Sequence, residues 1–490
     1  MYVPITRYSR ELPVNAAARQ LDPATILRDA LGEAAVVADA AGMARYLGDW
    51  SGDHQGSAAA VLRPASTAEV SEAIRLAHSL GLAIVPQGGN TGLVAGGFDT
   101  VPTRRSVVVS LERMNRVLGL DGDNFSIRVE AGSTLQQVKD YCEAAGFLFP
   151  LALGAQGSCQ IGGNVASNAG GVNVLRYGMM RDLVLGLEAV LADGEVWNGW
   201  SGLRKDNRGY DLKQLFVGSE GTLGIVTGVA LKLFPRPEAV ETAYLGVASF
   251  ADAMRLFAWA RRSCADMVTA FEVIGEECLP LARLIDPALV APVGAPVHVL
   301  AEVSGTDALD LRRLFEDFLA AALEDGLVSD AVLAASVAQA KSFWAIREGL
   351  VEGQARQGFH VRTDLSVPLS KVAALVDAAR RIIAAQYPGW TALAYGHAGD
   401  GNVHFNVLPP QGMAESAKRA TGAAILQALY DLVAAHDGSF SAEHGVGRSR
   451  RDVFWSSLPA LDKRLLRAIK QAFDPDGIMN PGCLFPEEAS

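Results

Sequence analysis

The chain has 490 residues, of which half are apolar and a fifth are charged, and its formal net charge is −11. This length predicts two or more domains, because a single hydrophobic core rarely serves more than about 300 residues. The composition is that of a globular enzyme, and a negative charge without a lysine- or arginine-rich stripe argues against a nucleic-acid-binding protein.

Membrane, secretory and metal-cluster signals are missing from the sequence. No apolar run reaches the roughly 18 residues of a membrane-spanning helix, and residues 1–11 lack the basic-then-apolar pattern of a secretory signal. The five cysteines lie far apart and form no C-x-x-C pair, which argues against iron–sulfur and zinc-finger sites. A small and odd number of cysteines fits a reducing compartment, in which thiols stay free, so we expect a cytoplasmic location. The oligomeric state stays open, with a homodimer as one option.

The first glycine-rich loop follows a predicted strand. Ser66–Glu69 has the pattern of a capping box and predicts a helix to about Leu80. Leu82–Val85 then predicts a buried strand, which ends in the loop Pro86-Gln-Gly-Gly-Asn-Thr-Gly92. A loop of small residues after a strand commonly binds phosphate through backbone N–H groups, although a plain turn is the alternative.

Two further loops of small residues occur in the first half of the chain. Gly157–Gly171 carries two Gly-Gly pairs and two asparagines, and glycine lets a main chain approach a large ligand closely. Gly218–Thr227 runs into another predicted strand. Neither a G-x-G-x-x-G motif after a first strand nor a P-loop occurs, so a Rossmann or P-loop nucleotide site is poorly supported. We therefore expect residues 1–237, with a helical N-terminal segment, to wrap a diphosphate cofactor by backbone contacts.

The second half of the chain has a different pattern of predicted elements. Predicted strands alternate with amphipathic helices near 250–263, 307–324, 369–385 and 414–435, which indicates an α+β domain with an antiparallel sheet and helices on one face. We assign residues 238–455 to this domain. The turn-rich segment Phe473–Gly482 predicts that residues 456–490 return to the first domain.

Two histidines flank a predicted hairpin turn within Tyr395–Asn406. Asp400-Gly401 predicts a two-residue β-turn, which places His397 directly opposite His404. Cross-strand partners have Cβ atoms about 4.5–5.5 Å apart, so the two imidazoles can bind one metal ion. A longer loop would decouple the pair. Asn406 lies on the same face as His404.

Glu443 and His444 follow the strand-like segment Gly438–Ala442. Neighbours in extended chain point in opposite directions, so we predict Glu443 as the third metal ligand and His444 as a base. The alternative for any histidine is an ordinary core or surface residue, as we expect for the three at positions 54, 78 and 298.

Two arginines are candidate anchors for a substrate carboxylate. Arg347 and Arg362 each offer a planar guanidinium that can bind a carboxylate with two hydrogen bonds. The sequence pattern around them fits solvated charges equally well.

These motifs together resemble those of FAD-dependent D-2-hydroxyacid dehydrogenases of the vanillyl-alcohol-oxidase-like superfamily, and most of all the D-2-hydroxyglutarate dehydrogenase branch. The matching stretches, in chain order, are Pro86–Gly92, Gly157–Gly171, Lys205–Phe216, Gly218–Ile225, Tyr395–Asn406, Ser441–Gly447 and Asn480–Gly482. The resemblance implies an α+β protein with a two-part FAD-binding domain of the vanillyl-alcohol-oxidase type and a cap domain that holds the substrate.

The resemblance also implies a set of cofactor contacts. FAD would lie against Pro86, Gly88, Gly89, Asn90, Thr91, Gly92, Gly157, Ser158, Gly162, Gly163, Asn164, Asn168, Glu220, Gly221, Ile225 and Asn480. Some relatives carry in the first loop a histidine that bonds to flavin, but this chain has Gly88-Gly-Asn90 there, so FAD should be non-covalent. By the same likeness, zinc or a similar divalent ion would bind His397, His404 and Glu443, and His444 would be the base. Arg347, Arg362 and Asn406 would contact the substrate.

The implied reaction is oxidation of a D-2-hydroxyacid to the 2-keto acid, with hydride transfer to flavin and electron transfer to an external acceptor such as electron-transfer flavoprotein or a quinone. Two positions depart from the glutarate-specific pattern, since Arg362 replaces a lysine and Val351 replaces a threonine. D-2-Hydroxyglutarate, D-malate and D-lactate therefore all stay open as substrates. The alternatives are a metal-independent oxidase that uses O₂ and a flavin subunit of a glycolate-oxidase-type complex.

Overall fold

The computed structural model describes residues 22–486 except 51, 101 and 103. The predictions for the extreme N-terminus, namely the missing secretory signal and the start of the helical segment, concern residues 1–21 and lie outside this described part. Among the described helices, none combines the length and the apolar character that crossing a bilayer requires.

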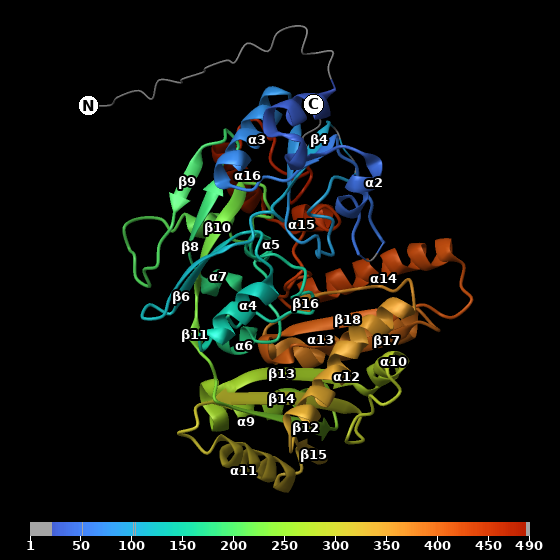
Figure 1. The fold of residues 1–490 in the computed structure, drawn as a ribbon. Coiled ribbons are helices and arrows are strands. Elements are labelled where there is room, and N and C mark those ends of the chain that lie inside the picture. Colours follow the sequence, from blue (N-terminus) through green and yellow to red (C-terminus); the bar gives the residue numbers. More distant parts are fainter. Residues whose placement is uncertain (1–21, 51, 101, 103, 487–490) are drawn as a thin grey trace.

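A four-stranded sheet forms the upper part of the molecule (Figure 1). Its strands, in spatial order, are β1 (Val36–Val37), β2 (Ala60–Leu62), β4 (Ser106–Ser110) and β3 (Ala83–Gln87). The last three run parallel and are almost wholly buried, as expected for continuous apolar strands. The predicted helix α3 (Thr67–Ser79) begins at Ser66, whose Oγ accepts a hydrogen bond from the N–H of Glu69. The short helices α1 (Pro23–Leu31) and α2 (Ala40–Met43) precede this unit.

A five-stranded antiparallel sheet completes the first half. Its order is β5 (Val117–Asp121), β6 (Ser126–Glu130), β10 (Ile225–Lys232), β8 (Val184–Val190) and β9 (Val196–Gly199). Asp193 and Gly194 lie in the turn of the β8–β9 hairpin, in which Val190 pairs with Val196. The helices between these strands are α4 (Leu135–Ala144), α5 (Ile161–Ala166), α6 (Val174–Tyr177), α7 (Met180–Leu183) and α8 (Lys213–Phe216). A two-stranded ribbon, β7 (Phe147–Leu148) with β11 (Phe234–Pro235), leads toward the second half.

A seven-stranded antiparallel sheet forms the lower half of Figure 1. Its order is β15 (Asp330–Leu333), β12 (Ala239–Val247), β14 (Val297–Gly305), β13 (Val268–Gly275), β17 (Thr391–Gly396), β18 (Asn402–Leu408) and β16 (Leu365–Ser366). The predicted antiparallel sheet is therefore present.

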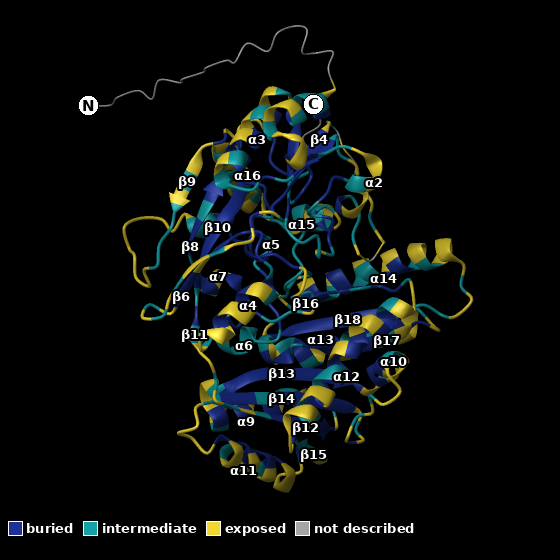
Figure 2. Ribbon diagram, in the orientation of Figure 1, coloured by how far each residue is buried: buried dark blue, intermediate teal, exposed yellow. Residues whose placement is uncertain are grey.

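Helices cover both faces of this sheet, so the prediction of one covered face is wrong. The first face packs on α9 (Phe250–Cys264), α11 (Leu311–Glu324), α13 (Val372–Gln386) and α14 (Glu415–Ala435). The second face packs on α10 (Leu279–Ile285) and α12 (Val337–Arg356). The physical reason lies in the central strand β13, where every residue is buried, so that apolar side chains on both of its faces need a cover. Figure 2 shows these strands as the buried interior, with exposed residues on the outer sides of the helices.

The C-terminal segment joins the core of the first half. After α15 (Arg451–Ser457) and α16 (Ala460–Phe473), Ile478 and Met479 are buried in the core that contains β3 and β10. Met479 forms a parallel bridge with Ile84, and the N–H of Asn480 donates to the carbonyl of Ile84. The segment lies beside α3 and β10 in Figure 1.

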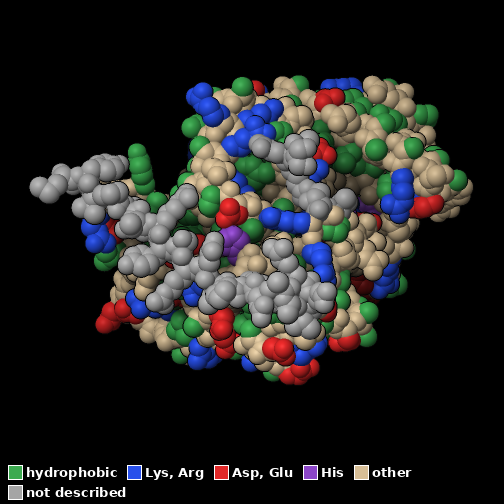
Figure 3. All heavy atoms as spheres, turned by 90° about the horizontal axis from the view of Figure 1, so that it is seen from above, with side chains coloured by type: hydrophobic (Ala, Val, Ile, Leu, Met, Phe, Trp, Pro, Cys, Tyr) green, Lys and Arg blue, Asp and Glu red, His purple; other side chains and the backbone are tan. Residues whose placement is uncertain are grey.

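Charge is mixed on the described part of the face that Figure 3 shows. On this described part, Lys and Arg side chains alternate with Asp and Glu side chains, and neither kind forms a continuous field.

Candidate active site

His397 and His404 lie at the junction of β17 and β18, but the predicted register between them is wrong. His404 pairs with Tyr395, because a turn of 3₁₀ helix, Ala398–Asp400, lengthens the connection between the strands. The shift is two residues, which keeps His404 on the same face of the sheet. His397 lies in the connection, and its ring centroid is 5.6 Å from that of His404. The two imidazoles therefore meet although they are not cross-strand partners.

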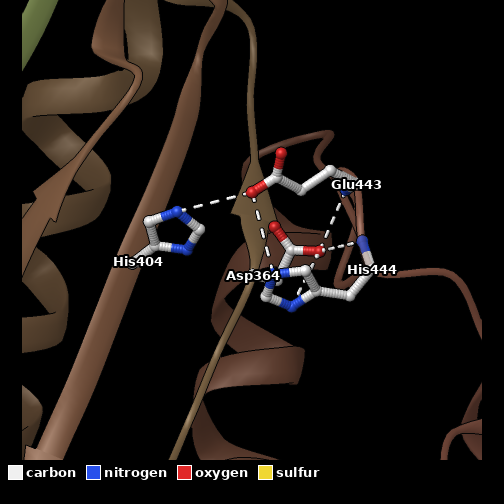
Figure 4. Close-up of side chains that lie close together, drawn as sticks. All are labelled: Asp364, His404, Glu443 and His444. Carbon is white, nitrogen blue, oxygen red and sulfur yellow. Dashed lines mark hydrogen bonds and ion pairs between the residues drawn. The ribbon is translucent and has the colours of Figure 1, made fainter. Parts of the chain in front are cut away.

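One carboxylate oxygen of Glu443 faces three imidazoles. Its Oε1 lies 3.6 Å from Nε2 of His404, 3.8 Å from Nε2 of His397 and 3.7 Å from Nε2 of His444. These separations are too long for hydrogen bonds. They are close to the spacing of about 3.4 Å between ligand atoms that share a tetrahedral zinc ion. The donor set thus fits a divalent cation, and Figure 4 shows Glu443, His404 and His444 turned toward one another.

The ligand atoms of Asp364, His404, Glu443 and His444 all lie within 4.8 Å of one another, so these four described residues form a group that could hold a cation; the predicted ligand His397 is not part of it. Sequence analysis missed Asp364. However, its Oδ2 already accepts backbone N–H hydrogen bonds from Ala442, Glu443 and His444, at 3.1, 2.9 and 2.8 Å. The same oxygen lies 3.5 Å from Nδ1 of His444. Asp364 therefore positions the loop and orients the His444 ring so that Nε2 faces Glu443.

The residues around Asp364 keep its carboxyl group ionised. Burial alone would raise its pKa, but His444, His404 and Arg450 hold the pKa of this carboxyl well below its ordinary value. The carboxylate therefore stays ionised and keeps its hydrogen bonds to the loop.

Glu272, on β13, is a second carboxylate that the sequence did not single out. It is 1% exposed, accepts a hydrogen bond of 2.7 Å from Nε of Arg347, and lies 2.5 Å from Nδ1 of His397. Burial alone would lower the pKa of His397, but Glu272 raises it to about 9, while burial and the neighbouring His397 charge lower the pKa of His404 to about 3. A carboxylate on the far nitrogen fixes the ring of a metal-binding histidine and leaves Nε2 toward the ion.

The predicted substrate-contact residues lie on the same face of the sheet. Arg347 is 7% exposed and its guanidinium carbon lies 4.8 Å from the ring centre of Tyr395. The side-chain amide of Asn406 accepts from the N–H of Thr363 and donates to Oε1 of Gln354 and to the hydroxyl of Tyr395. These bonds tie Asn406 to β17, to α12 and to the segment that contains Thr363. The Arg362 guanidinium contacts His360 and Asp53 instead.

The first two glycine loops pack against each other through their backbones. A Cβ atom on Gly89 would lie 1.9 Å from the carbonyl oxygen of Ser158, and one on Gly88 would lie 3.3 Å from the Cα of Gly163. By contrast, Cβ atoms on Gly92 and Gly157 would meet no described atom within 4 Å. Each loop thus has one part that packs against the other loop and another part whose backbone has free space beside it.

Unsatisfied polar atoms beside these loops fit a dinucleotide. Gln160 Oε1 and Asn164 Oδ1 are buried and have no hydrogen-bond partner among the described residues. Buried acceptors without a donor are rare in native structures, and ribose hydroxyls or an adenine amino group would supply one. Strain is also concentrated here, since Asn90, Asn168, Glu220 and Asn480 have left-handed φ angles of 54°, 49°, 49° and 44°.

Glu220 and Asn480 connect the first half to the loop that carries Glu443 and His444. The Glu220 carboxylate accepts the N–H groups of Val446 and Gly447, at 2.8 and 2.7 Å. Asn480 donates to the carbonyl of Glu220. Their side chains are therefore occupied by protein groups. The remaining predicted cofactor residues lie in or beside the three loops: Pro86 near the end of β3, Thr91 in the loop after it, Gly162 at the start of α5, Gly221 in the turn before β10, and Ile225 at the start of β10.

The sequence matches two families. Residues 58–199 match the family described as "FAD binding domain", and residues 236–484 match "FAD linked oxidases, C-terminal domain". The chain is 41% identical to the mitochondrial D-2-hydroxyglutarate dehydrogenase of Bos taurus, over 90% of this chain and 79% of that protein. It is 35% identical to the D-2-hydroxyglutarate dehydrogenase of Xanthomonas citri pv. viticola, over 91% of this chain and 93% of that one.

Among solved structures, 4-ethylphenol oxidase from Gulosibacter chungangensis superimposes with a TM-score of 0.73 at 20% identity, covering 97% of this chain and 99% of that one. This likeness shows the fold of the vanillyl-alcohol-oxidase type. The predicted cytoplasmic location is contradicted by the relatives, because the name of the cattle protein places that enzyme in mitochondria.

Proposed function

Because the chain belongs to the family of FAD-dependent D-2-hydroxyacid dehydrogenases, we propose that it oxidises a D-2-hydroxyacid to the 2-keto acid with the help of a bound divalent cation. The observation that carries this proposal is the convergence of His397, His404 and His444 on one oxygen of Glu443, within 3.6–3.8 Å. Passive flavin binding would need no such cluster.

The cation would be held by His397, His404 and Glu443. When bound there, zinc or a similar ion would lower the pKa of the substrate hydroxyl. Two features support this ligand set over one that includes Asp364. His397 has its Nδ1 engaged by Glu272 and its Nε2 directed to the site, whereas Oδ2 of Asp364 already accepts three backbone hydrogen bonds.

His444 would take the proton of the hydroxyl group at its Nε2 atom. Imidazole is the commonest general base in enzymes, and a base needs a fixed orientation toward the proton that it removes. Here Asp364 lies behind the ring, 3.5 Å from Nδ1, and holds the backbone N–H of His444 itself. The arrangement resembles other histidine bases that are oriented by a carboxylate.

The remaining predicted site residues would bind FAD and orient the substrate. The backbone of Gly88–Gly92 and Gly162–Asn168 would hold FAD, and the bound flavin would supply the acceptor for the hydride equivalent of the substrate. Arg347 lies on the same face of the sheet as His404, and its positive charge would orient the substrate carboxylate. The electrons would then pass to an external acceptor.

The test is flavin reduction under anaerobic conditions, with D- and L-enantiomers of lactate, malate and 2-hydroxyglutarate, before and after dialysis against a chelator. We expect a D-enantiomer to bleach the flavin, chelation to abolish the reaction, and Zn²⁺ or Mn²⁺ to restore it. A full rate after chelation would favour the metal-independent oxidase. Failure of every D-acid to reduce the flavin would overturn the proposed reaction.

A further inference from the structure

Arg362 lies two residues before Asp364, on the segment that pairs with β18. Leu365 pairs with Val403 and Val361 pairs with Val407. The same register sets Asp364 opposite His404 and Arg362 opposite Asn406, and direct cross-strand partners share a face of the sheet. The guanidinium is therefore attached to the face that carries the candidate base and metal ligands, at the edge of that cluster.

The guanidinium of Arg362 is held by three groups. Its Nε donates to Nε2 of His360 at 3.0 Å, and its NH1 lies 3.2 Å from Oδ2 of Asp53. The ring of Trp50 lies 6.0 Å from its terminal carbon. The Nδ1 atom of His360 lies 2.8 Å from the carbonyl oxygen of Gly358, which identifies Nδ1 as the protonated nitrogen and leaves the Nε2 lone pair for Arg362.

Asp53 reaches Arg362 from the first half of the molecule. Its own segment is fixed from within, because Gly48 bridges Gln55 and Oδ1 of Asp49 accepts the N–H groups of Asp53 and His54. The Asp53 and Arg362 side chains are 42% and 31% exposed, so water and small ions reach the pair. A carboxylate from one half of the chain thus neutralises a cation beside the site in the other half.

We propose that Asp53 determines substrate specificity: by pairing with Arg362, it favours D-2-hydroxyacids with an uncharged distal group over those with a second carboxylate. This inference rests on the proposed function. A second carboxylate would have to displace Asp53 from Arg362 and would then lie near the negative charge of Asp53. A substrate with a methyl group at that end would leave the Asp53–Arg362 pair intact.

The decisive variant is Asp53→Asn, which keeps the size of the side chain and removes its charge. We compare kcat/KM for D-2-hydroxyglutarate and D-lactate with an artificial electron acceptor. An exposed ion pair is weak, so we expect the hydroxyglutarate-to-lactate ratio to rise about two- to fivefold, mainly through a lower KM for hydroxyglutarate. Asp266→Asn is the matched control, because Asp266 is also exposed and also pairs with an arginine, Arg261, away from this site. It should leave the ratio unchanged.

A second measurement does not depend on turnover. Titration of the oxidised holoenzyme with 2-oxoglutarate and with pyruvate, followed by the flavin absorbance, should show tighter 2-oxoglutarate binding in Asp53→Asn and unchanged pyruvate binding. In the Arg362→Gln background, the Asp53→Asn change should have no effect on either ratio. If the wild-type enzyme oxidises D-acids but Asp53→Asn alters neither ratio, the role of Asp53 is refuted. If no D-acid is oxidised while the binding ratio still shifts, the proposed reaction fails, and what stands is the effect of Asp53 on the binding of a second carboxylate.

Discussion

Nδ1 of His397 lies 2.5 Å from Oε1 of Glu272, deep inside the cap sheet. The other oxygen of Glu272 accepts a hydrogen bond from Nε of Arg347. One buried carboxylate thus orients a candidate metal ligand and a candidate substrate anchor at once. The pKa of Glu272 is informative here: burial would raise it, but His397 and Arg347 lower it to about 2, so Glu272 stays ionised.

We predict that Glu272→Gln weakens metal binding about 10- to 100-fold, because the amide no longer holds the His397 ring as a charged acceptor does. The measurement is a titration of the apo-protein with Zn²⁺, followed by metal content after gel filtration. The matched control is Glu302→Gln, which lies on the neighbouring strand β14 and touches Trp344, Thr242 and Thr269 rather than a histidine. Unchanged zinc affinity in Glu272→Gln would argue against His397 as a ligand.

His444→Ala should fold and keep its flavin but lose about 10²- to 10⁴-fold of the rate of flavin reduction, as expected for removal of a general base. The backbone N–H of His444 donates to Oδ2 of Asp364, and alanine retains this hydrogen bond. The rate is measured by stopped-flow absorbance at saturating substrate. His78→Ala serves as the control, since His78 is an exposed partner of Asp476. Reduction at the wild-type rate in His444→Ala would remove this residue from the reaction.

Two glycine substitutions separate packing from cofactor binding. Gly89→Ala should destabilise even the apo-protein, by about 1–3 kcal/mol, because its Cβ would lie 1.9 Å from the Ser158 carbonyl oxygen. Gly92→Ala meets no described atom within 4 Å, so it should leave the apo-protein stable and weaken only FAD binding. Thermal unfolding of the apo-proteins and FAD titration distinguish the two effects. Gly154→Ala, which is also in open space, is the control for both. Normal FAD affinity in Gly92→Ala would place the cofactor elsewhere.

The sequence identified the parts of the site whose chemistry is local. Turn residues placed the hairpin between His397 and His404, and small residues marked the loops that follow β3 and precede α5. The register failed because Asp400-Gly401 is not the whole connection: Ala398–Asp400 forms a 3₁₀ turn of its own. A dipeptide signal cannot distinguish a two-residue turn from the end of a longer one.

The positioning carboxylates could not be found locally. Glu272 lies 125 residues from His397, and Asp364 lies 80 residues from His444. The available signal was weak: Glu272 is the single charged residue within the otherwise apolar or neutral run Val268–Gly275. Helix α12 was missed because apolar and polar residues alternate around it without a clear stripe, although it covers a face of the sheet.

The raised pKa of Glu302 predicts how the stability of the folded protein depends on pH. Burial raises its pKa above the ordinary value, only partly offset by hydrogen bonds from Trp344, Thr242 and Thr269. A raised pKa in the folded state means that its stabilising contribution is complete below the pKa of the unfolded chain and is lost as the pH rises through the folded value. Glu302→Gln mimics the protonated form, so its unfolding temperature should match that of the wild type near pH 4 and exceed it near pH 8. Differential scanning calorimetry of both proteins in the same buffers measures this difference, and Glu324→Gln, at an exposed position of α11, is the control. A difference that shrinks toward high pH would mean that Glu302 is more stable ionised than protonated.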